Sequence, residues 1–431
     1  MASSRRCCSR TPASSLKILF VHQNFPGQYS HIVRALARQG SHQLVALGIE
    51  ALSGPMPKGL TYVRYPLQRG TTPGIHPWIQ DIETKTIRAE ACANAAHDLK
   101  SQGFSPDLIC GHPGWGEVLF LRDLWPEVPI LTYQEFYYQL NGFDSDFDPE
   151  LQGSPDWRAG ARIRLKVLNQ QLSLQASSWC VAPTAFQRSS FPAAWQPRIS
   201  VIHDGIDTNV IQPDPDPAPL TLPDGTELRA GDPIVTFVNR RLEPYRGCHT
   251  MIRAIPDLQR LAPDARLVIV GDTTGVSYGA ACAHGEWKDH FLAEIEGRYD
   301  PARVHFTGRL PYASFLRLFQ LSAAHVYLTY PFVLSWSLLE AMASGCAVVG
   351  SDTAPVREVI RDGHNGLLVD FFQPADLAAA AAEVLANRPL AQRLGEQARQ
   401  TILAQYSLSR CLPHQLALMS LVASRALGAE R

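Results

Sequence analysis

Two arginines near the middle of the chain have the residue type and the spacing that binding a diphosphate requires. Arg241 and Arg246 lie five residues apart, in the loop that follows the apolar run 234–238. The planar guanidinium group can bind two phosphate oxygens at once, so two arginines at the end of one strand can neutralise linked phosphates. A solvated charged loop explains the same two residues equally well when they are taken alone.

A second candidate lies in residues 330–349, where an apolar strand gives way to a helix. We expect the helix to begin between Ser335 and Ser337 and to end at Gly345, because glycine adopts the left-handed backbone that ends many helices. The free amide groups of a helix start favour an anion such as phosphate. Glu340 lies just over one turn further on, where its carboxylate could accept hydrogen bonds from a ribose. The alternative is that Ser335 only caps the helix and Glu340 is a solvated surface residue.

Two further segments place polar residues directly after predicted strands. His112 follows the strand 107–110 in a loop rich in glycine, where its ring could bind a sugar hydroxyl or a phosphate, although a lone histidine is more often structural. Asp204 and Gly205 follow the strand 199–202, and Gly205 would let the backbone approach a ligand closely. A plain turn fits these two residues equally well.

The elements that must position these residues are alternating strands and helices. The run 16–22, a glycine-containing loop, an amphipathic helix ending near Gly40 and a strand at 43–47 form a βαβ opening. Strands that alternate with helices predict parallel sheets covered by helices on both faces. The later predicted strands are 107–110, 129–133, 179–182, 199–202, 234–238, 266–271, 304–308, 324–328 and 347–350.

The composition changes near the middle of the chain. Residues 212–219 carry proline at every second position, and we expect a Pro-rich linker at 212–233 between an N-terminal α/β domain at 16–211 and a C-terminal α/β domain at 234–405. Ligands in such folds bind at the carboxyl ends of the strands, so we expect the ligand in a cleft between the domains. Residues 1–15 lack the apolar core of a secretory signal and are expected to be a disordered extension.

The overall composition argues against several classes of function. The 39 Lys and Arg residues balance 40 Asp and Glu residues, which argues against a nucleic-acid-binding protein with a broad cationic face. The nine cysteines include no C-x-x-C pair, so neither a zinc site nor a disulfide framework is indicated. No apolar run reaches about 18 residues, so no membrane span is expected.

Two charged patterns allow more than one interpretation. Arg158, Arg162 and Lys166 recur every four residues on a predicted helix of the first domain, which could rest on an anionic membrane surface or form a solvated face. The alternating aspartates of 144–148 have the spacing of a calcium-binding loop. The glycine and the distal glutamate of such a loop are not at the right offsets, so we interpret the segment as a polar loop.

Taken in order along the chain, these motifs resemble those of the retaining, nucleotide-sugar-dependent glycosyltransferases of family 4, which have the GT-B fold. The similarity extends from Lys17 to about Ser424 and is most specific in Arg241-Leu242-x-x-x-Arg246-Gly247, in 308–311 and in 339–345. The resemblance implies an α/β protein of two Rossmann-like domains whose parallel sheets face each other across a cleft. It also implies a C-terminal helix, within 406–431, that crosses back to pack on the first domain.

The resemblance also implies roles for individual residues. Arg241 and Arg246 would neutralise the donor diphosphate as the leaving group departs, and His112 would orient the donor sugar. Glu340 would bind the ribose, and Gly27 would bring a backbone amide to the phosphate or the sugar. Further donor contacts are expected from the helix start at Ser335, Trp336, Ser337 and Leu338 and, beside the base, from Gly308, Arg309 and Leu310. Cations replace a metal in this family, so no metal and no cofactor is expected.

Three positions depart from the pattern of the family. The family usually has two glutamates eight positions apart, and Phe332 stands where the first of them, which contacts hydroxyls of the donor sugar, would fall. Arg246 replaces the usual lysine, and Gly27 stands alone where two glycines are common. We therefore place Phe332 at the sugar pocket, together with Asp204 and Gly205.

The expected activity is transfer of a sugar from a UDP-, GDP- or ADP-linked donor to a glycan, a lipid-linked or a small-molecule acceptor, with retention of configuration, as in polysaccharide biosynthesis. A cytoplasmic protein is expected, with or without peripheral contact to the inner face of the membrane. One alternative is a non-catalytic relative that binds a nucleotide or a glycan, which Phe332 favours and the retained Arg241, Arg246 and Glu340 oppose. Another is a GT-B enzyme of a different reaction, a nucleotide-sugar epimerase or a phosphorylase.

Overall fold

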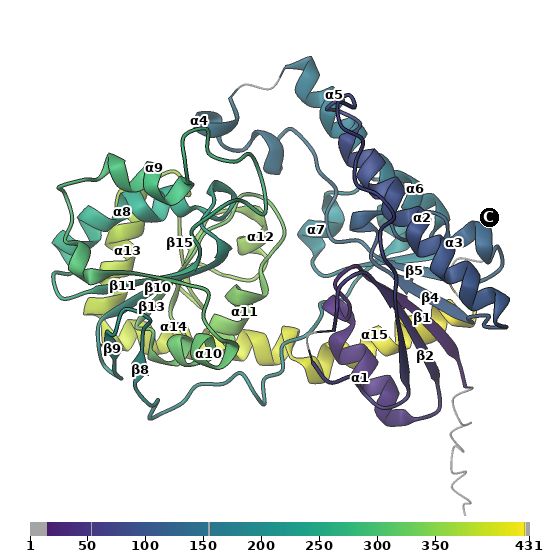
Figure 1. Cartoon of the computed structure of the whole chain (residues 1–431). Helices are drawn as coiled ribbons and strands as arrows, with labels where there is room; N and C mark the ends of the chain where they lie inside the picture. Colours follow the sequence, from purple (N-terminus) through teal and green to yellow (C-terminus); the bar gives the residue numbers. More distant parts are fainter. Residues whose placement is uncertain (1–14, 53, 154–155, 426, 428–431) are drawn as a thin grey trace, which may run out of the picture. The chain divides into compact units, whose positions relative to one another are not determined.

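The computed structural model describes residues 15–52, 54–153, 156–425 and 427 (Figure 1). The expected disordered extension at 1–15 lies outside the described residues, apart from Ser15. The chain divides into two compact units, each of which is described by itself. Among the described residues, the first unit holds those within 15–134, 165–181 and 415–427, and the second unit holds those within 135–164 and 182–414.

Seven strands form the first sheet, in the order β3-β2-β1-β4-β5-β6-β7 of a doubly wound α/β fold. The pairs from β3 to β6 are parallel. Alternate side chains of β1 point to opposite faces. Leu19 and Val21 pack in the core that contains α2 and α3, whereas the ring of Phe20 packs on the ring of Tyr29 at 5.3 Å. The strands are β1 (Lys17–Val21), β2 (Gln43–Gly48), β3 (Leu60–Arg64), β4 (Leu108–Gly111), β5 (Ile130–Tyr133), β6 (Trp179–Ala182) and β7 (Ile199–Val201). The helices of the first unit are α1 (Ser30–Gln39), α2 (Gln80–Ser101), α3 (Leu121–Leu124) and α6 (Leu168–Ala176).

Six parallel strands form the sheet of the second unit, in the order β12-β11-β10-β13-β14-β15. Val235 and Phe237 of β10 face one core cluster, which includes side chains of α8, α9 and α13, and Val238 faces a second cluster, which includes side chains of α10 and α11. The strands are β10 (Ile234–Arg241), β11 (Arg266–Asp272), β12 (Val304–Gly308), β13 (Ala324–Tyr327), β14 (Val348–Ser351) and β15 (Leu367–Val369). The helices are α7 (Ala185–Ser189), α8 (Cys248–Leu261), α9 (Trp287–Glu294), α10 (Tyr312–Leu321), α11 (Trp336–Ala343), α12 (Ala354–Arg357), α13 (Pro374–Ala386) and α14 (Arg388–Thr401).

The predicted strands are confirmed, with ends that differ by a few residues, and two strands of the two parallel sheets, β3 and β15, were missed. The missed β3 is only partly buried and β15 has three residues, so neither gives a strong apolar run. The stretch 212–233, predicted as a linker, lies within the second unit. It contains the antiparallel pair of β8 (Leu220–Thr221) and β9 (Glu227–Leu228), and Leu222 and Leu228 are buried there. The predicted domain limits at 16–211 and 234–405 stay predictions.

The aspartates of 144–148 fasten their segment to the sheet of the second unit. Asp144 accepts a hydrogen bond from the Tyr245 hydroxyl at 2.9 Å, and Asp148 accepts one from the Tyr330 hydroxyl at 2.7 Å. Asp148 also caps α4 (Pro149–Gln152). The alternation that suggested a calcium loop therefore positions carboxylates for hydrogen bonds within the fold.

The chain passes from one unit to the other within two of its helices, α5 and α15. The predicted helix with the cationic stripe is α5 (Trp157–Lys166), and its residues up to Arg164 belong to the second unit. The C-terminal helix α15 (Leu408–Ala423) begins in the second unit, and its residues from Gln415 belong to the first, as the crossing implied by the resemblance requires. Within the described part of the chain, we find no helix of the length and apolarity that crossing a bilayer demands.

Candidate functional site

Each sheet has one point where the strand order reverses, between β1 and β4 in the first and between β10 and β13 in the second. Ligands of doubly wound sheets bind beside the carboxyl ends of the strands at such a point. The predicted residues Gly27 and His112 follow β1 and β4, and Arg246 and Phe332 follow β10 and β13. The topology therefore places the main predicted residues of each unit at the binding edge of its own sheet.

His112 of the first unit lies in a cluster of rings at the ends of β1, β4 and β5. It is 2% exposed and stacks on Trp115 at 4.5 Å and on Tyr133 at 5.5 Å, and the ring of His22 lies 5.4 Å away. His22 follows β1, which pairs with β4 so that Val21 lies opposite Gly111. The parallel pairing of these two strands is thus what brings the two histidines together.

Both histidines are neutral near pH 7. Burial lowers the pKa of His22 to about 4, and burial together with the nearby His22 holds the pKa of His112 well below its usual range. Nδ1 of His112 accepts the amide hydrogen of Gly114 at 3.1 Å, so the single ring proton is on Nε2. His112 can therefore donate one hydrogen bond from Nε2, as a sugar hydroxyl or a phosphate would require.

Gly27 is required by the position of His22. Its φ is +47°, and a Cβ atom there would lie 2.4 Å from the His22 ring. That ring is held at Nε2 by Gln28 at 2.7 Å and at Nδ1 by the amide of Asn24 at 3.0 Å. The predicted contact of the Gly27 amide with a ligand stays a prediction. Sequence reasoning missed His22, although it ends the predicted strand 16–22.

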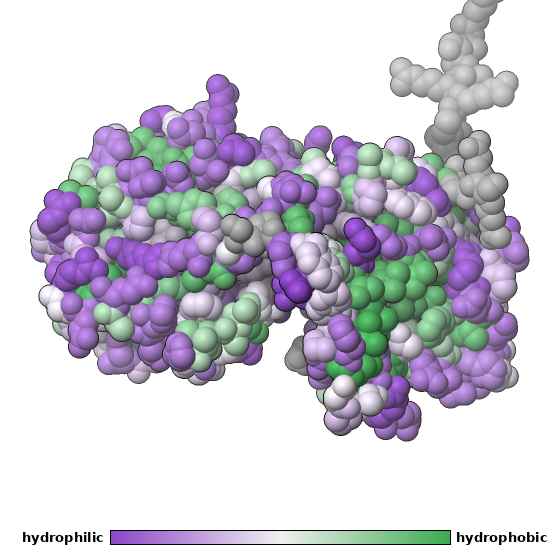
Figure 2. Space-filling model, turned by 90° about the horizontal axis from the view of Figure 1, so that it is seen from above, coloured by the Kyte–Doolittle hydropathy of each residue, from purple (hydrophilic) through white to green (hydrophobic). Residues whose placement is uncertain are grey.

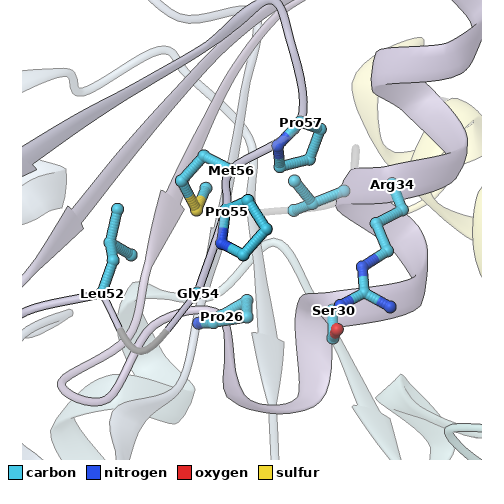
Figure 3. Close-up of a pocket in the computed structure, with 9 residues that line it drawn as sticks. Pro26, Ser30, Arg34, Leu52, Gly54, Pro55, Met56 and Pro57 are labelled. Carbon is cyan, nitrogen blue, oxygen red and sulfur yellow. The ribbon is translucent and has the colours of Figure 1, made fainter.

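A cavity of about 220 Å³ lies beside the same loop (Figure 3). Ser30 and Arg34 of α1 form one side, and Leu52 with residues 54–57 forms the other, where Pro55, Met56 and Pro57 are labelled. Pro26, which precedes Gly27, lines it as well. The cavity therefore combines a largely apolar lining with one cation and one hydroxyl group.

In the second unit, Arg246 is held among aromatic rings. Its side chain is 7% exposed, and Nη1 donates to Thr329 Oγ1 at 2.9 Å and to the carbonyl oxygen of Val333 at 2.8 Å. The guanidinium carbon lies 5.5 Å from the ring centres of both Tyr278 and Phe332. Two hydrogen bonds and two ring faces thus fix the cation in place before any ligand binds.

Phe332 lies inside a cluster of aromatic side chains. It is 1% exposed, and its ring centre lies 4.8 Å from those of Phe136 and Tyr278 and 5.3 Å from that of Tyr245. Phe332 and Arg246 are therefore in contact, which a common site for the two residues requires. That Phe332 borders a sugar stays a prediction.

Arg241 ends β10 and donates from Nη1 to the carbonyl oxygen of Thr274. Between the two predicted arginines lies Glu243, which is 1% exposed and accepts a hydrogen bond from the amide of Tyr278 at 3.1 Å. Burial raises the pKa of Glu243, and the charges of Arg246 and Arg241 partly offset that rise. Both arginines therefore lie close to one buried carboxylate, a residue that sequence reasoning missed because a loop glutamate usually faces solvent.

The start of α11 has the predicted helix cap. Ser335 precedes the helix and its hydroxyl accepts the amide hydrogen of Ser337 at 3.4 Å, while its own amide donates to the Tyr327 hydroxyl at 2.8 Å. Trp336 is 44% exposed, and its indole N–H donates to Asp204 at 2.8 Å. Ser335 thus caps the helix, and phosphate binding here stays a prediction. Leu338, by contrast, is fully buried in the core.

Glu340 is not the solvated residue of the alternative interpretation. Oε1 accepts a hydrogen bond from the Tyr312 hydroxyl at 2.7 Å, and burial raises the pKa of Glu340, an effect that the Tyr312 bond partly offsets. Gly308 ends β12 with φ +65°, and Arg309 pairs with Asp272 at 2.5 Å. Leu310 packs against the core cluster that contains α11.

Gly205 is required for packing within the second unit. Its φ is +90°, and a Cβ atom there would lie 2.9 Å from Cα of Leu408. The close backbone approach predicted for a ligand is thus made to the start of α15. Asp204, its neighbour, accepts a hydrogen bond from the indole N–H of Trp336, the first residue of α11.

Two family models together match most of the chain. The model described as Glycosyl transferase family 4 group matches residues 40–211, and the model described as Glycosyl transferases group 1 matches residues 222–401. A D-inositol 3-phosphate glycosyltransferase from Nocardioides sp. is 29% identical over 251 residues, which cover 54% of this chain and 52% of that protein. The chain spans about half the length, or less, of the first curated relatives that it matches.

Solved structures share the fold at low identity. Sucrose-phosphate synthase from Thermosynechococcus elongatus aligns with a TM-score of 0.70 at 15% identity. The alignment covers 95% of this chain and 100% of that chain. HepE from Anabaena in complex with UDP-glucose aligns with a TM-score of 0.63 at 16% identity, covering 94% of this chain and 99% of that one. The two parallel sheets and these likenesses confirm the predicted GT-B fold, and the matches to the two family models show the relationship: the chain belongs to the family 4 glycosyltransferases.

Proposed function

We propose that the chain is an active glycosyltransferase that moves a sugar from a nucleoside-diphosphate donor to an acceptor. The observation that carries this proposal is the fixed guanidinium of Arg246. Its Nη1 hydrogens are used within the protein, whereas Nη2 makes no hydrogen bond to any residue that the structure describes. A cation that is 7% exposed and ready to donate suits a phosphate oxygen.

The remaining residues fit this chemistry. As the bond from the sugar to the diphosphate breaks, negative charge develops on the leaving group, and Arg246 and Arg241 stabilise it. Glu340 binds the ribose in place of part of its contact with Tyr312, and the amide groups at the start of α11 bind the distal phosphate. His112 donates from Nε2 to a hydroxyl of the donor sugar. We propose that these cations substitute for a metal ion and that the configuration is retained, as the family resemblance implies.

We propose UDP as the nucleotide, because HepE, with the same fold, was solved with UDP-glucose. For the acceptor, we propose that the cavity beside Pro26 binds one part of it. The largely apolar lining with Arg34 and Ser30 suits an acceptor that has an apolar segment next to an anionic or hydroxyl group. A lipid-linked phosphate has this chemistry.

We further propose that α5 makes peripheral contact with an anionic membrane. Trp157 is 68% exposed, and Arg158 lies over its ring at 4.7 Å, while Arg162 is exposed on the same helix. Aromatic and cationic side chains together suit the interface of an anionic bilayer. Figure 2 shows a mostly hydrophilic surface with one larger hydrophobic area on its right-hand part, the side of the first unit.

The experiment that tests the proposed function is calorimetric titration with UDP, GDP and ADP, without and with Mg²⁺. We expect one nucleotide to bind, and we expect Arg241→Ala to weaken that binding at least tenfold with no effect of the metal. Arg260→Ala is the matched control, because Arg260 is an exposed arginine of α8 that pairs only with Asp257 among the described residues. No binding of any nucleotide would overturn the proposal.

One observation favours a second candidate, a relative that binds a nucleotide without catalysis. The position of the family's first glutamate is filled by Phe332, which is buried and cannot bind a hydroxyl. Product analysis separates the candidates. A nucleotide that binds with no sugar transfer and no change in the donor indicates the non-catalytic relative. A changed donor without any acceptor indicates an epimerase.

A further inference from the structure

The donor half of the site lacks a group for the sugar at the usual place. A carboxylate at position 332 would accept hydrogen bonds from sugar hydroxyls, and the phenyl ring that stands there accepts none. An active transferase still has to hold its donor sugar in one orientation. The question is therefore which carboxylate of the second unit lies close to position 332.

Glu135 opens the segment 135–164 of the second unit, directly after β5. Its carbonyl oxygen accepts a hydrogen bond from Gln187 Nε2 at 2.7 Å, which fixes the main chain at this point. The next residue, Phe136, packs its ring on that of Phe332 at 4.8 Å with an interplanar angle of 73°. The backbone of Glu135 is thus anchored beside the residue that replaces the family's glutamate.

The charges around this ring show where the carboxylate lies. Burial raises the pKa of Glu135, and the charges of Arg246 and then Arg240 oppose that rise. The pKa of Tyr278 is raised by burial and next by the charge of Glu135. Arg246 and Tyr278 both lie against Phe332, so the Glu135 carboxylate lies close to the same cluster.

We propose that Glu135 binds hydroxyl groups of the donor sugar and so replaces the glutamate that the family has at position 332. The proposal rests on the proposed function, because it requires that Arg246 binds the donor diphosphate. The sugar is bonded directly to that diphosphate, so a carboxylate close to Arg246 is within reach of the first hydroxyls of the sugar. A carboxylate accepts up to about four hydrogen bonds, which suits two neighbouring hydroxyls.

A different role for Glu135 predicts a different result. If Glu135 only paired with Arg246, its loss would change the affinity for the diphosphate itself, with or without a sugar. If it binds the sugar, its loss affects the nucleotide sugar and spares the free nucleotide. The measured quantity is therefore the ratio of the affinities for a nucleotide sugar and for its free nucleotide.

The test compares UDP with UDP-glucose, and GDP with GDP-mannose, by calorimetry on the full chain. In the wild type we expect one nucleotide sugar to bind about tenfold more tightly than its nucleotide. In Glu135→Gln we expect a loss of about 10- to 100-fold for the nucleotide sugar and a change of no more than about twofold for the nucleotide, because an amide replaces a charged acceptor. Glu135→Asp, which keeps the charge on a shorter side chain, should recover part of the loss.

Glu150→Gln is the matched control, since Glu150 lies on the same segment, has a side chain that is 51% exposed and pairs with Arg253 at 2.6 Å. It should leave both affinities unchanged, and thermal unfolding of all variants confirms that they are folded. Equal losses for nucleotide and nucleotide sugar in Glu135→Gln, or no loss for either, would overturn the proposal and leave the proposed function standing. So would a wild type that binds both ligands equally. Failure of every nucleotide to bind the wild type would overturn the proposed function itself.

Discussion

Arg246→Lys installs the residue that the family usually has, and we expect it to weaken nucleotide binding. The guanidinium divides its roles: Nη1 donates to Thr329 Oγ1 and to the carbonyl oxygen of Val333, whereas Nη2 makes no hydrogen bond to any described residue and is proposed to bind the phosphate. A lysine has one nitrogen at the end of its stem. If the ammonium keeps the two internal hydrogen bonds, it is poorly placed for the phosphate, and if it turns to the phosphate, two oxygens inside the protein lose their donor.

The expected magnitude follows from these contacts. One charge-assisted hydrogen bond is worth about 1.5 to 3 kcal/mol. The loss of guanidinium stacking on Phe332 and Tyr278 removes about a further 0.5 kcal/mol, since an ammonium also interacts with ring faces. A net loss of about 2 to 3.5 kcal/mol corresponds to an affinity for UDP that is about 30- to 400-fold weaker. Arg246→Met, which has no charge, should lose at least that much.

The assay is calorimetric titration with UDP, with thermal unfolding of each variant to confirm that it is folded. A double-mutant cycle with Phe332→Leu measures the stacking directly, and we expect a coupling of about 0.5 to 1 kcal/mol between positions 246 and 332. An Arg246→Lys variant that binds UDP as tightly as the wild type would refute the reasoning, because the planar group would then have no role that a point charge cannot fill. A retained affinity in Arg246→Met would remove Arg246 from the phosphate site altogether.

Four further predictions concern other parts of the molecule. The affinity for UDP should fall as the pH drops through the pKa of Glu340, which burial places above its usual value, and Glu340→Gln should be weak at every pH; titrations between pH 4.5 and 8 test this. Glu117 is fully buried in the first unit, and burial raises its pKa to about 7. A raised carboxyl pKa means that stability is lost as the pH rises from about 4.5 to 7, so Glu117→Gln should raise the free energy of unfolding in urea by up to about 3 kcal/mol at pH 8 and change it little at pH 5. Arg34→Ala should weaken the binding of octyl phosphate about three- to tenfold, leave octanol and UDP unaffected, and identify the cavity as an anion-binding acceptor site. Reversing two charges of α5, with Arg158→Glu and Arg162→Glu, should abolish co-sedimentation with vesicles containing anionic lipid, and equal sedimentation would show that α5 is a solvated face.

The sequence predicted the strands of the sheets and the loops that follow them because both depend on local signals. An apolar run followed by glycine and charged residues marks the end of a buried strand, and parallel strands place all such ends at one edge. This is why the positions of Arg246 and His112, after β10 and β4, could be predicted from single loops, while their roles stay predictions. The helix start at Ser335 was equally local, since a capping serine and the glycine at 345 both act within a few residues.

The residues that were missed depend on contacts between distant segments. His22 is brought to His112 only by the pairing of β1 with β4, across about ninety positions of sequence. Glu135 precedes the second unit's strands by about a hundred positions, and its place beside Arg246 follows from the packing of Phe136 on Phe332. The close backbone approach at Gly205 could be predicted because a glycine's conformational freedom is visible in the sequence, whereas the segment that approaches it, at Leu408, is not.

Two departures from the family pattern, which look independent in the sequence, are coupled in the structure. A phenyl ring at position 332 presents a face to the cation at position 246, and a planar guanidinium covers that face better than a compact, strongly hydrated ammonium does. Phe332 and Arg246 therefore favour each other. The phenylalanine at position 332 also removes a carboxylate from the sugar side of the donor site. We propose that the carboxylate of Glu135 takes its place. On this view the three residues form one alternative arrangement of the donor site, and changing any one of them alone should be worse than changing the set together.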